Sequence, residues 1–143
     1  GKANLAASSF FSSIIREPLN NLEVILPVRD SVRHWHVSPR SAIGFLIYAA
    51  GLNFDELGTR RSLNLPGVSC TVAEQIEALR AISGQEAVDR IKFIEDKKIS
   101  AIVSGWPENF DPVRALELGF VAEKDFSEII MAYIEDDLRP ILN

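Results

Sequence analysis

The chain has 143 residues, of which 47% are hydrophobic, so it is long enough to bury one domain-sized core. Its net charge of −5 at pH 7 argues against a general nucleic-acid binder, because such proteins carry a basic surplus. No apolar run approaches the roughly 20 residues that cross a membrane, and a single cysteine excludes an intramolecular disulfide. We therefore expect a cytoplasmic protein with no membrane or nucleic-acid partner.

The chain opens on "GKANLAASSFF", which contains neither an initiator methionine nor a signal peptide. We therefore expect a portion of a longer protein. Apolar residues at helical spacing predict an amphipathic helix over residues 4–19, ending near Pro18. The β-prone run 23–29 predicts a short edge strand with a bend at Pro27.

Both histidines lie in the alternating run 32–37, which predicts a strand with His34 and His36 on one face and Arg33 on the other. Two histidines on one face could chelate a metal, but no short spacing supplies a third ligand. A polar strand face beside a cleft, with no metal, is the preferred interpretation.

Ser38 and Pro39 then predict a helix start, because a serine oxygen accepts a first-turn amide and proline fits the first helical position. The helix predicted over residues 39–51 is apolar nearly all round, so we expect both its faces to be covered.

The second half of the chain mixes both kinds of element. Residues 61–67 predict a strand closed by a Pro-Gly turn, and Thr71 with Glu74 predicts a capping box at a helix start. A helix over residues 85–96 and a β-branched strand over 99–105 follow.

Two helices close the chain. A short one starts at Asp111-Pro112 and stops at Gly119, and Asp125 with Glu128 opens the last, over 126–138. Intermingled helices and strands predict a mixed α/β fold.

Several side chains suit an anionic ligand. Arg33 and Arg40 each present a planar fork that matches a carboxylate or phosphate, although an ordinary surface ion pair explains either arginine equally well. Lys2, Asn4, Ser8 and Ser9 gather around the first helix start, where they could form a small anion site, although these residues alone favour plain capping of the helix.

The sequence lacks a complete catalytic apparatus. It contains no G-x-G-x-x-G loop, no P-loop, no Tyr-x-x-x-Lys pair and no nucleophile elbow. Cys70 has no neighbouring histidine or charged pair in sequence, so we interpret it as a structural thiol.

Three segments in order resemble the C-terminal part of the extended short-chain dehydrogenase/reductases, the NAD-dependent epimerase/dehydratase family. They are "RHWHVSPRSAIGFLIYAA", "SLNLPGVSCTVAEQIEALRAI" and "FDPVRALELGFVAEKDFSEII". Further segments, "ASSFF", "SVRHWH", "SPRSA" and "GWP", are similar to a subgroup that acts on small sugar acids such as D-erythronate.

The resemblance implies that residues 1–143 are the substrate-binding region, with residues 39–66 returning to a Rossmann domain that this chain lacks. NAD and the catalytic Tyr-x-x-x-Lys pair would then belong mainly to that missing N-terminal part, so this stretch alone should be inactive. The full-length protein could form a homodimer.

The resemblance also implies roles for particular residues. Gly1 would lie beside the cofactor, Arg33 would anchor the substrate, and Lys2 and Asn4 would form a polar rim. Ser9, His34, His36 and Arg40 complete the candidate set of substrate-binding residues.

The sequence departs from the family at two positions, since His34 and Arg40 stand where aspartate is common. These changes favour a small acid over a nucleotide sugar. We therefore expect an NAD-dependent oxidoreductase that oxidises a hydroxyl of a small sugar acid by hydride transfer. A nucleotide-diphosphate-sugar epimerase or dehydratase is the alternative, and a non-catalytic NAD(P)-sensing regulator is an alternative of another class.

Overall fold

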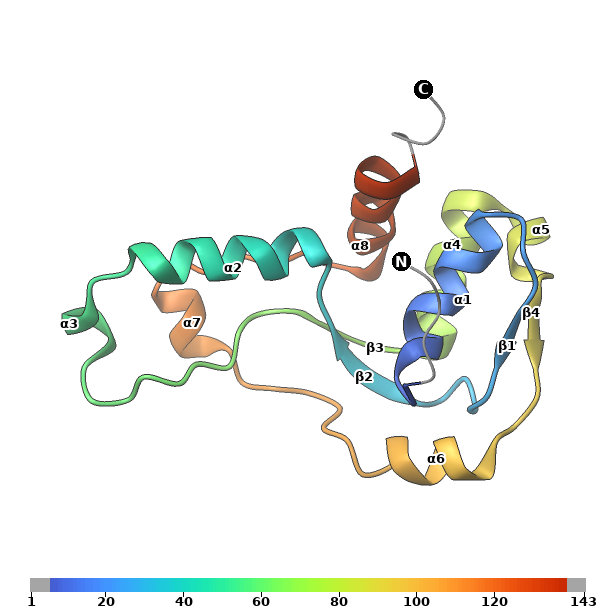
Figure 1. Cartoon of the computed structure of the whole chain (residues 1–143), viewed down its shortest axis with the longest axis horizontal. Coiled ribbons are helices and arrows are strands. Elements are labelled where there is room, and N and C mark those ends of the chain that lie inside the picture. Colours follow the sequence, from blue (N-terminus) through green and yellow to red (C-terminus); the bar gives the residue numbers. More distant parts are fainter. Residues whose placement is uncertain (1–5, 139–143) are drawn as a thin grey trace. The chain divides into compact units, whose positions relative to one another are not determined.

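The structure is a computed structural model that describes residues 6–138, apart from the side chains of residues 54 and 56 (Figure 1). The chain divides into two compact units, each built from two stretches of sequence. Unit 1 comprises residues 1–34 and 70–107, and unit 2 comprises residues 35–69 and 108–143. In the described part of the chain no helix is long and apolar enough to cross a membrane.

Unit 1 is a small α/β layer around a two-stranded parallel sheet. Strand β1 (Val24–Leu26) pairs with β4 (Ile91–Phe93), so that Val24 stands opposite Ile91 and Leu26 opposite Phe93. The helices of this unit are α1 (Ser9–Leu19), α4 (Val72–Ser83), α5 (Gln85–Val88) and α6 (Lys97–Val103).

The core of unit 1 lies between its helices and β1. Ile14 of α1 and Leu79 of α4 are fully buried, and Leu26 of β1 is 4% exposed. Helix α1 is amphipathic because its apolar side chains recur at helical spacing, and this buried stripe packs on β1 and α4.

Unit 2 is mainly helical. It contains α2 (Pro39–Gly51), α3 (Phe54–Leu57), α7 (Val113–Glu117), α8 (Phe126–Tyr133) and a terminal π turn, Ile134–Leu138. Phe45, Ala115 and Phe120 form its core, and the Phe45 and Phe120 rings meet edge to face with centroids 5.9 Å apart. A second two-stranded sheet joins β2 (Arg33–His36) to β3 (Val68–Thr71).

Most predicted helix starts are confirmed. The Ser38 hydroxyl accepts the Ser41 amide at 3.0 Å and α2 begins at Pro39. Thr71 and Glu74 form the reciprocal capping box of α4. Asp125 caps α8 through the Glu128 amide, and Gly119 adopts a φ of 91°, a left-handed conformation that suits glycine after α7.

Three predicted elements are wrong. The strand expected over 61–67 begins only at Val68, because the described residues 61–67 join neither two-stranded sheet. The helix expected over 85–96 stops at Val88, since the parallel pairing of β4 with β1 overrides the helical pattern. The strand expected over 99–105 lies mostly in a helix, α6.

The α6 error has a local cause. The Asp96 carboxylate accepts the backbone N–H groups of Lys98 and Ile99 at 2.8 and 3.1 Å, and this N-cap starts a helix despite the β-branched residues that follow. The first helix also differs slightly: α1 starts at Ser9 and runs one residue past Pro18.

Helix α2 has a covered face and an uncovered one. Phe45 is buried in unit 2, whereas Ile43, Leu46 and Ile47 are 58%, 72% and 70% exposed. Within the described chain only one face is covered, so cover of the second face stays a prediction.

Candidate functional site

The candidate residues of strand β2 project to opposite faces, because successive side chains alternate along a strand. Arg33 turns toward the start of α4, where its Nη2 atom lies 3.0 Å from Oε2 of Glu74. His34 turns toward Phe11 of α1, and the two rings stack with centroids 5.2 Å apart and planes at 19°. A ligand that contacts both residues therefore lies at an end or edge of the strand rather than over one face.

The carboxylate beside Arg33, that of Glu74, is held in place by the capping box at the start of α4. The backbone N–H of Thr71 donates to Oε2 of Glu74 at 2.6 Å. This bond, the Thr71 hydroxyl and the Arg33 charge together lower the pKa of Glu74. Arg33 thus meets a fixed, ionised carboxylate, and an acidic ligand must share or replace that contact.

The imidazole of His34 is held by three groups of unit 1. Its Nδ1 atom lies 2.9 Å from the carbonyl oxygen of Pro107, and its ring centroid lies 5.5 Å from that of Trp106. Phe11 supplies the third contact. In the sequence "GWP" carries only a similarity, and no local pattern predicts that Trp106 or Pro107 contacts His34.

His36 belongs to the other unit and contacts Phe126 of α8, edge to face, with centroids 5.4 Å apart. Trp35 likewise contacts Phe110 in unit 2. Among the described residues, no group of three or more His, Cys, Asp or Glu side chains is placed to hold a metal ion.

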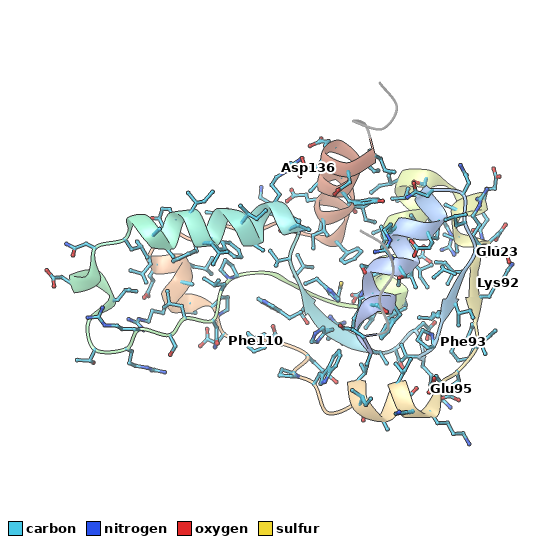
Figure 2. All side chains as sticks on the ribbon, in the orientation of Figure 1. Glu23, Lys92, Phe93, Glu95, Phe110 and Asp136 are labelled. Atoms are coloured by element: carbon cyan, nitrogen blue, oxygen red, sulfur yellow. The ribbon has the colours of Figure 1, made fainter. Side chains whose placement is uncertain are left out.

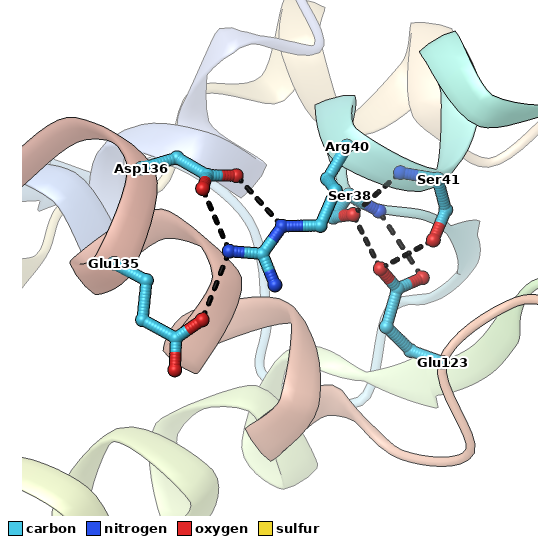
Figure 3. A network of polar contacts seen from close by, with 6 residues as sticks. All are labelled: Ser38, Arg40, Ser41, Glu123, Glu135 and Asp136. Carbon is cyan, nitrogen blue, oxygen red and sulfur yellow. Dashed lines mark hydrogen bonds and ion pairs between the residues drawn. The ribbon is translucent and has the colours of Figure 1, made fainter.

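Arg40 is engaged by two carboxylates of the terminal π turn (Figure 3). Its Nε and Nη2 atoms donate to Asp136 at 2.9 and 2.7 Å, and Nη2 also donates to Glu135 at 2.9 Å. The hydrogen bonds to Asp136 and then Glu135 raise the pKa of Arg40, and the Arg40 bond lowers that of Asp136. An anionic ligand at Arg40 would have to displace this bidentate pair.

Glu123, which sequence analysis missed, anchors the start of α2 (Figure 3). It accepts hydrogen bonds from the hydroxyls of Ser38 and Ser41, the latter at 2.7 Å, and from the Ser38 N–H at 3.4 Å. Burial pushes the Glu123 pKa upward, but the bonds from Ser38 and Ser41 outweigh it and the pKa is lowered. No local sequence pattern announces this contact, because the glutamate lies in the loop before α8.

Three of the candidates near the chain start, Gly1, Lys2 and Asn4, lie outside the described residues. Ser9 begins α1 and lines an open hollow of about 1060 Å³ in unit 1. Glu23 and Lys92 pair at 3.7 Å at the wall of this hollow (Figure 2). Its lining holds more carboxylates than lysines: Glu17, Glu23, Glu95 and Asp96 against Lys92 and Lys97.

Cys70 is 5% exposed, and burial raises the pKa of its thiol to about 11. A thiol with that pKa is protonated near neutral pH, which agrees with the prediction of a structural role.

Comparisons with known proteins agree with this fold. No protein-family model matches the chain. Over 136 residues it is 44% identical to a D-erythronate dehydrogenase of Cupriavidus necator, covering 95% of this chain and 42% of that protein. The chain is a homologue of the D-erythronate dehydrogenases. A second such enzyme, from Haemophilus influenzae, is 39% identical over 138 residues, which cover 96% of this chain and 44% of that protein.

Solved structures show the same architecture. A nucleoside-diphosphate-sugar epimerase from Agrobacterium tumefaciens matches with a TM-score of 0.95 and 52% identity, over 97% of this chain and 41% of the other. An L-threonine dehydrogenase from Cupriavidus necator matches at 20% identity with a TM-score of 0.79, over 95% of this chain and 43% of the other, which shows the fold alone.

The chain thus spans about two-fifths of the length of the relatives it matches. These matches confirm the predicted resemblance to the epimerase/dehydratase family, its sugar-acid subgroup and the α/β fold class.

Proposed function

We propose that the chain is the substrate-binding portion of an NAD-dependent oxidoreductase that oxidises a hydroxyl of a small sugar acid resembling D-erythronate. The observation that carries this proposal is identity of 44% and 39%, across nearly the whole chain, to two D-erythronate dehydrogenases. The polar side chains of β2, Arg33 and His34, are of the types that bind the carboxylate and hydroxyl groups of a small acid.

The hydride chemistry belongs to the rest of the protein in this proposal. The sequence contains no glycine-rich dinucleotide loop and no Tyr-x-x-x-Lys pair, so NAD binds mainly to residues beyond this chain and Gly1 only approaches it. Such a tyrosine would serve as the acid/base at the substrate hydroxyl. The chain alone is therefore expected to be inactive.

Arg33 is the proposed carboxylate anchor. Its Nη2 atom already lies 3.0 Å from one carboxylate oxygen, Oε2 of Glu74, and a guanidinium also suits a substrate carboxylate. Lys2 and Asn4 form the proposed polar rim, Ser9 is a further substrate-binding candidate, and a histidine of β2 contacts a hydroxyl. Arg40 fits less well, because two carboxylates hold it, Glu135 and Asp136, and Asp136 accepts two hydrogen bonds from its guanidinium.

Residues 39–66 are proposed to pack on the dinucleotide-binding domain. Two observations support this: the uncovered apolar face of α2, and the β-prone run 61–67, which pairs with no described strand. Covering each side chain of that face stabilises the protein by about 1.5–3 kcal/mol relative to leaving it in water.

The test is turnover by the full-length protein. NADH formation is followed with NAD and a panel of four-carbon hydroxy acids, for the wild type and for Arg33→Ala and Arg33→Lys. We expect oxidation of at least one acid, a KM raised roughly tenfold or more by Arg33→Ala, and partial recovery by Arg33→Lys. An Arg33→Ala enzyme with unchanged KM would exclude the anchor role.

A nucleotide-diphosphate-sugar epimerase or dehydratase is the second candidate, because the chain is 52% identical to the epimerase structure over the matched part, which covers 41% of that protein. It predicts that the full-length protein binds UDP- or dTDP-sugars in calorimetry and does not oxidise four-carbon acids. A non-catalytic NAD(P) sensor predicts neither activity, and the absence of a Tyr-x-x-x-Lys pair from the full-length sequence would support it.

A further inference from the structure

Helix α8 is attached to the start of α2 at both of its ends. Before α8, the Glu123 carboxylate accepts a hydrogen bond from the hydroxyl of Ser38. After α8, the terminal π turn holds Arg40 through the carboxylates of Glu135 and Asp136 (Figure 3). All of these residues belong to unit 2. The segment that contains α8 is therefore pinned at two points on one helix start.

The two attachments differ in their exposure to solvent. Ser38 is completely buried, so dissolved salt screens its bond to Glu123 only weakly. The side chains of Arg40, Glu135 and Asp136 are 49%, 42% and 48% exposed. Ion pairs between exposed side chains weaken as the ionic strength rises. The attachment after α8 can therefore open while the attachment before α8 holds.

The π form of the terminal turn suits the pairing with Arg40. A π turn closes its hydrogen bonds over five residues instead of four, so consecutive side chains point less far apart around its axis than in an α-helix. Glu135 and Asp136 are consecutive, and one nitrogen of Arg40, Nη2, donates to them at 2.9 and 2.7 Å. The ion pair thus favours the π turn over a further turn of α-helix.

Arg40 also compensates a concentration of negative charge. The described residues that line the adjoining hollow of about 510 Å³ include one arginine, Arg40, and four acids: Glu123, Asp125, Glu128 and Glu135. The terminal turn carries a further acid, Asp137, beside Asp136. Without the guanidinium, the carboxylates of the turn would repel one another and their neighbours.

We propose that Arg40 is a latch that holds the terminal turn, residues 134–138, in its π form against the start of α2, and that rising ionic strength releases this turn while α8 stays folded. Release frees the Arg40 guanidinium for an external carboxylate or phosphate, so the latch also controls access to this arginine. The inference concerns a conformational change within unit 2 and does not depend on which substrate the protein binds.

The test is hydrogen–deuterium exchange of the full-length protein, measured by mass spectrometry in peptides that cover the terminal turn and, separately, α8. At low salt Arg40→Gln should speed exchange of the turn roughly threefold to tenfold and leave α8 nearly unchanged. Asp136→Asn should act in the same direction, because Asp136 accepts two of the three bonds from Arg40. Asp137→Asn is the matched control, since it removes the same charge from the same turn and leaves both partners of Arg40 in place.

Salt distinguishes a latch from an ordinary packing contact. Raising the NaCl concentration from about 0.1 M to about 1 M shortens the screening length from about 10 Å to about 3 Å. In the wild type the turn should then exchange faster, because salt weakens its pairing with Arg40. In Arg40→Gln it should exchange more slowly, because salt relieves the repulsion among the carboxylates of the turn.

Three outcomes would overturn the inference. The turn could exchange equally fast in the wild type and in Arg40→Gln at low salt. Asp137→Asn could loosen the turn as much as Asp136→Asn does, or salt could change exchange in the same direction in the wild type and in Arg40→Gln. Exchange in α4, in the other unit, shows whether each variant is folded. If Arg40→Gln fails to fold, the double variant Glu135→Gln/Asp136→Asn supplies the comparison at low salt.

Discussion

One oxygen of Glu74 serves two partners: Oε2 accepts the backbone N–H of Thr71 at 2.6 Å and lies 3.0 Å from Nη2 of Arg33. The helix cap therefore sets the position of the charge that Arg33 faces. Glu74, which takes part in the capping box of α4, therefore also competes with any acid that binds Arg33.

The first prediction concerns a substitution that removes the competing charge of Glu74. In the full-length enzyme, Glu74→Gln should lower the KM for the acid substrate several-fold, because Gln keeps the capping box but no longer neutralises Arg33. The stability loss should stay below about 1 kcal/mol, since the pair is half exposed. Steady-state kinetics and denaturant unfolding measure the two effects. Glu77→Gln, on the same helix and paired with Arg80, is the matched control, and an unchanged or raised KM for Glu74→Gln would argue against Arg33 as the anchor.

A second prediction concerns Glu123. Glu123→Gln should lower the free energy of unfolding by about 1–3 kcal/mol, because hydrogen bonds from Ser38 and Ser41 lose their charged acceptor and Ser38 is completely buried. Urea unfolding of the full-length protein measures this change. Glu117→Gln, an exposed position on α7, should change stability by less than about 0.5 kcal/mol.

The lowered pKa of Glu123 predicts that the stability of the protein depends on pH. Its pKa is lowered in the folded state, so its contribution to stability is fully present above the unfolded-state value. That contribution declines as the pH falls through the folded-state pKa. Stability measured between neutral and acidic pH should therefore fall less steeply for Glu123→Gln than for the wild type. If the stability of the two proteins falls equally steeply as the pH is lowered, Glu123 is not the source of this pH dependence.

A fourth prediction concerns Gly67. A Cβ atom there would lie 2.6 Å from the carbonyl oxygen of His36 and 2.7 Å from Nε1 of Trp35. Gly67→Ala should therefore destabilise the protein by about 1–3 kcal/mol, as overpacking does. Gly51→Ala, with nothing within 4 Å of its Cβ position, is the control and should not destabilise. Thermal unfolding of both variants tests this prediction. If Gly67→Ala leaves the stability unchanged, β2 can shift to make room for the added methyl group.

The fifth prediction tests the proposed cover of α2. Leu46 is 72% exposed in this chain, so Leu46→Ser should be nearly neutral if the side chain is exposed in the full-length protein as well. If the dinucleotide-binding domain covers it, the full-length protein should lose about 1.5–3 kcal/mol. Leu22→Ser in unit 1, where Leu22 is 57% exposed, is the comparison. Equal effects of the two substitutions would contradict the proposed packing.

Sequence patterns predicted those features that depend on neighbours along the chain. The Ser38 cap, the Thr71 capping box and the turn at Gly119 each involve residues within a few positions of one another. The failures have distant causes. Strand β4 exists because β1 pairs with it, and periodicity over residues 85–96 carries no trace of that partner.

The candidate site shows the same division. The alternation of β2 correctly placed Arg33 and His34 on different faces, because alternation is local. The partners could not be predicted, since Glu123, Asp136 and Pro107 each lie more than seventy residues from the residue they contact. Arg40 illustrates the consequence. Its guanidinium suits an anion, and in the structure that anion is the carboxylate of the protein's own Asp136.

The parallel pairing of β1 with β4 also constrains how the protein is made. Val24 pairs with Ile91, and the first stretch of unit 2, residues 35–69, lies between them in the chain. During synthesis β1 leaves the ribosome long before its partner β4 exists. Closing the long loop between the two strands costs conformational entropy, and only the strand pairing that follows can offset this cost. Until residue 93 has emerged, α1, which packs on β1 in the folded protein, is the neighbour already available to cover the apolar side chains of β1.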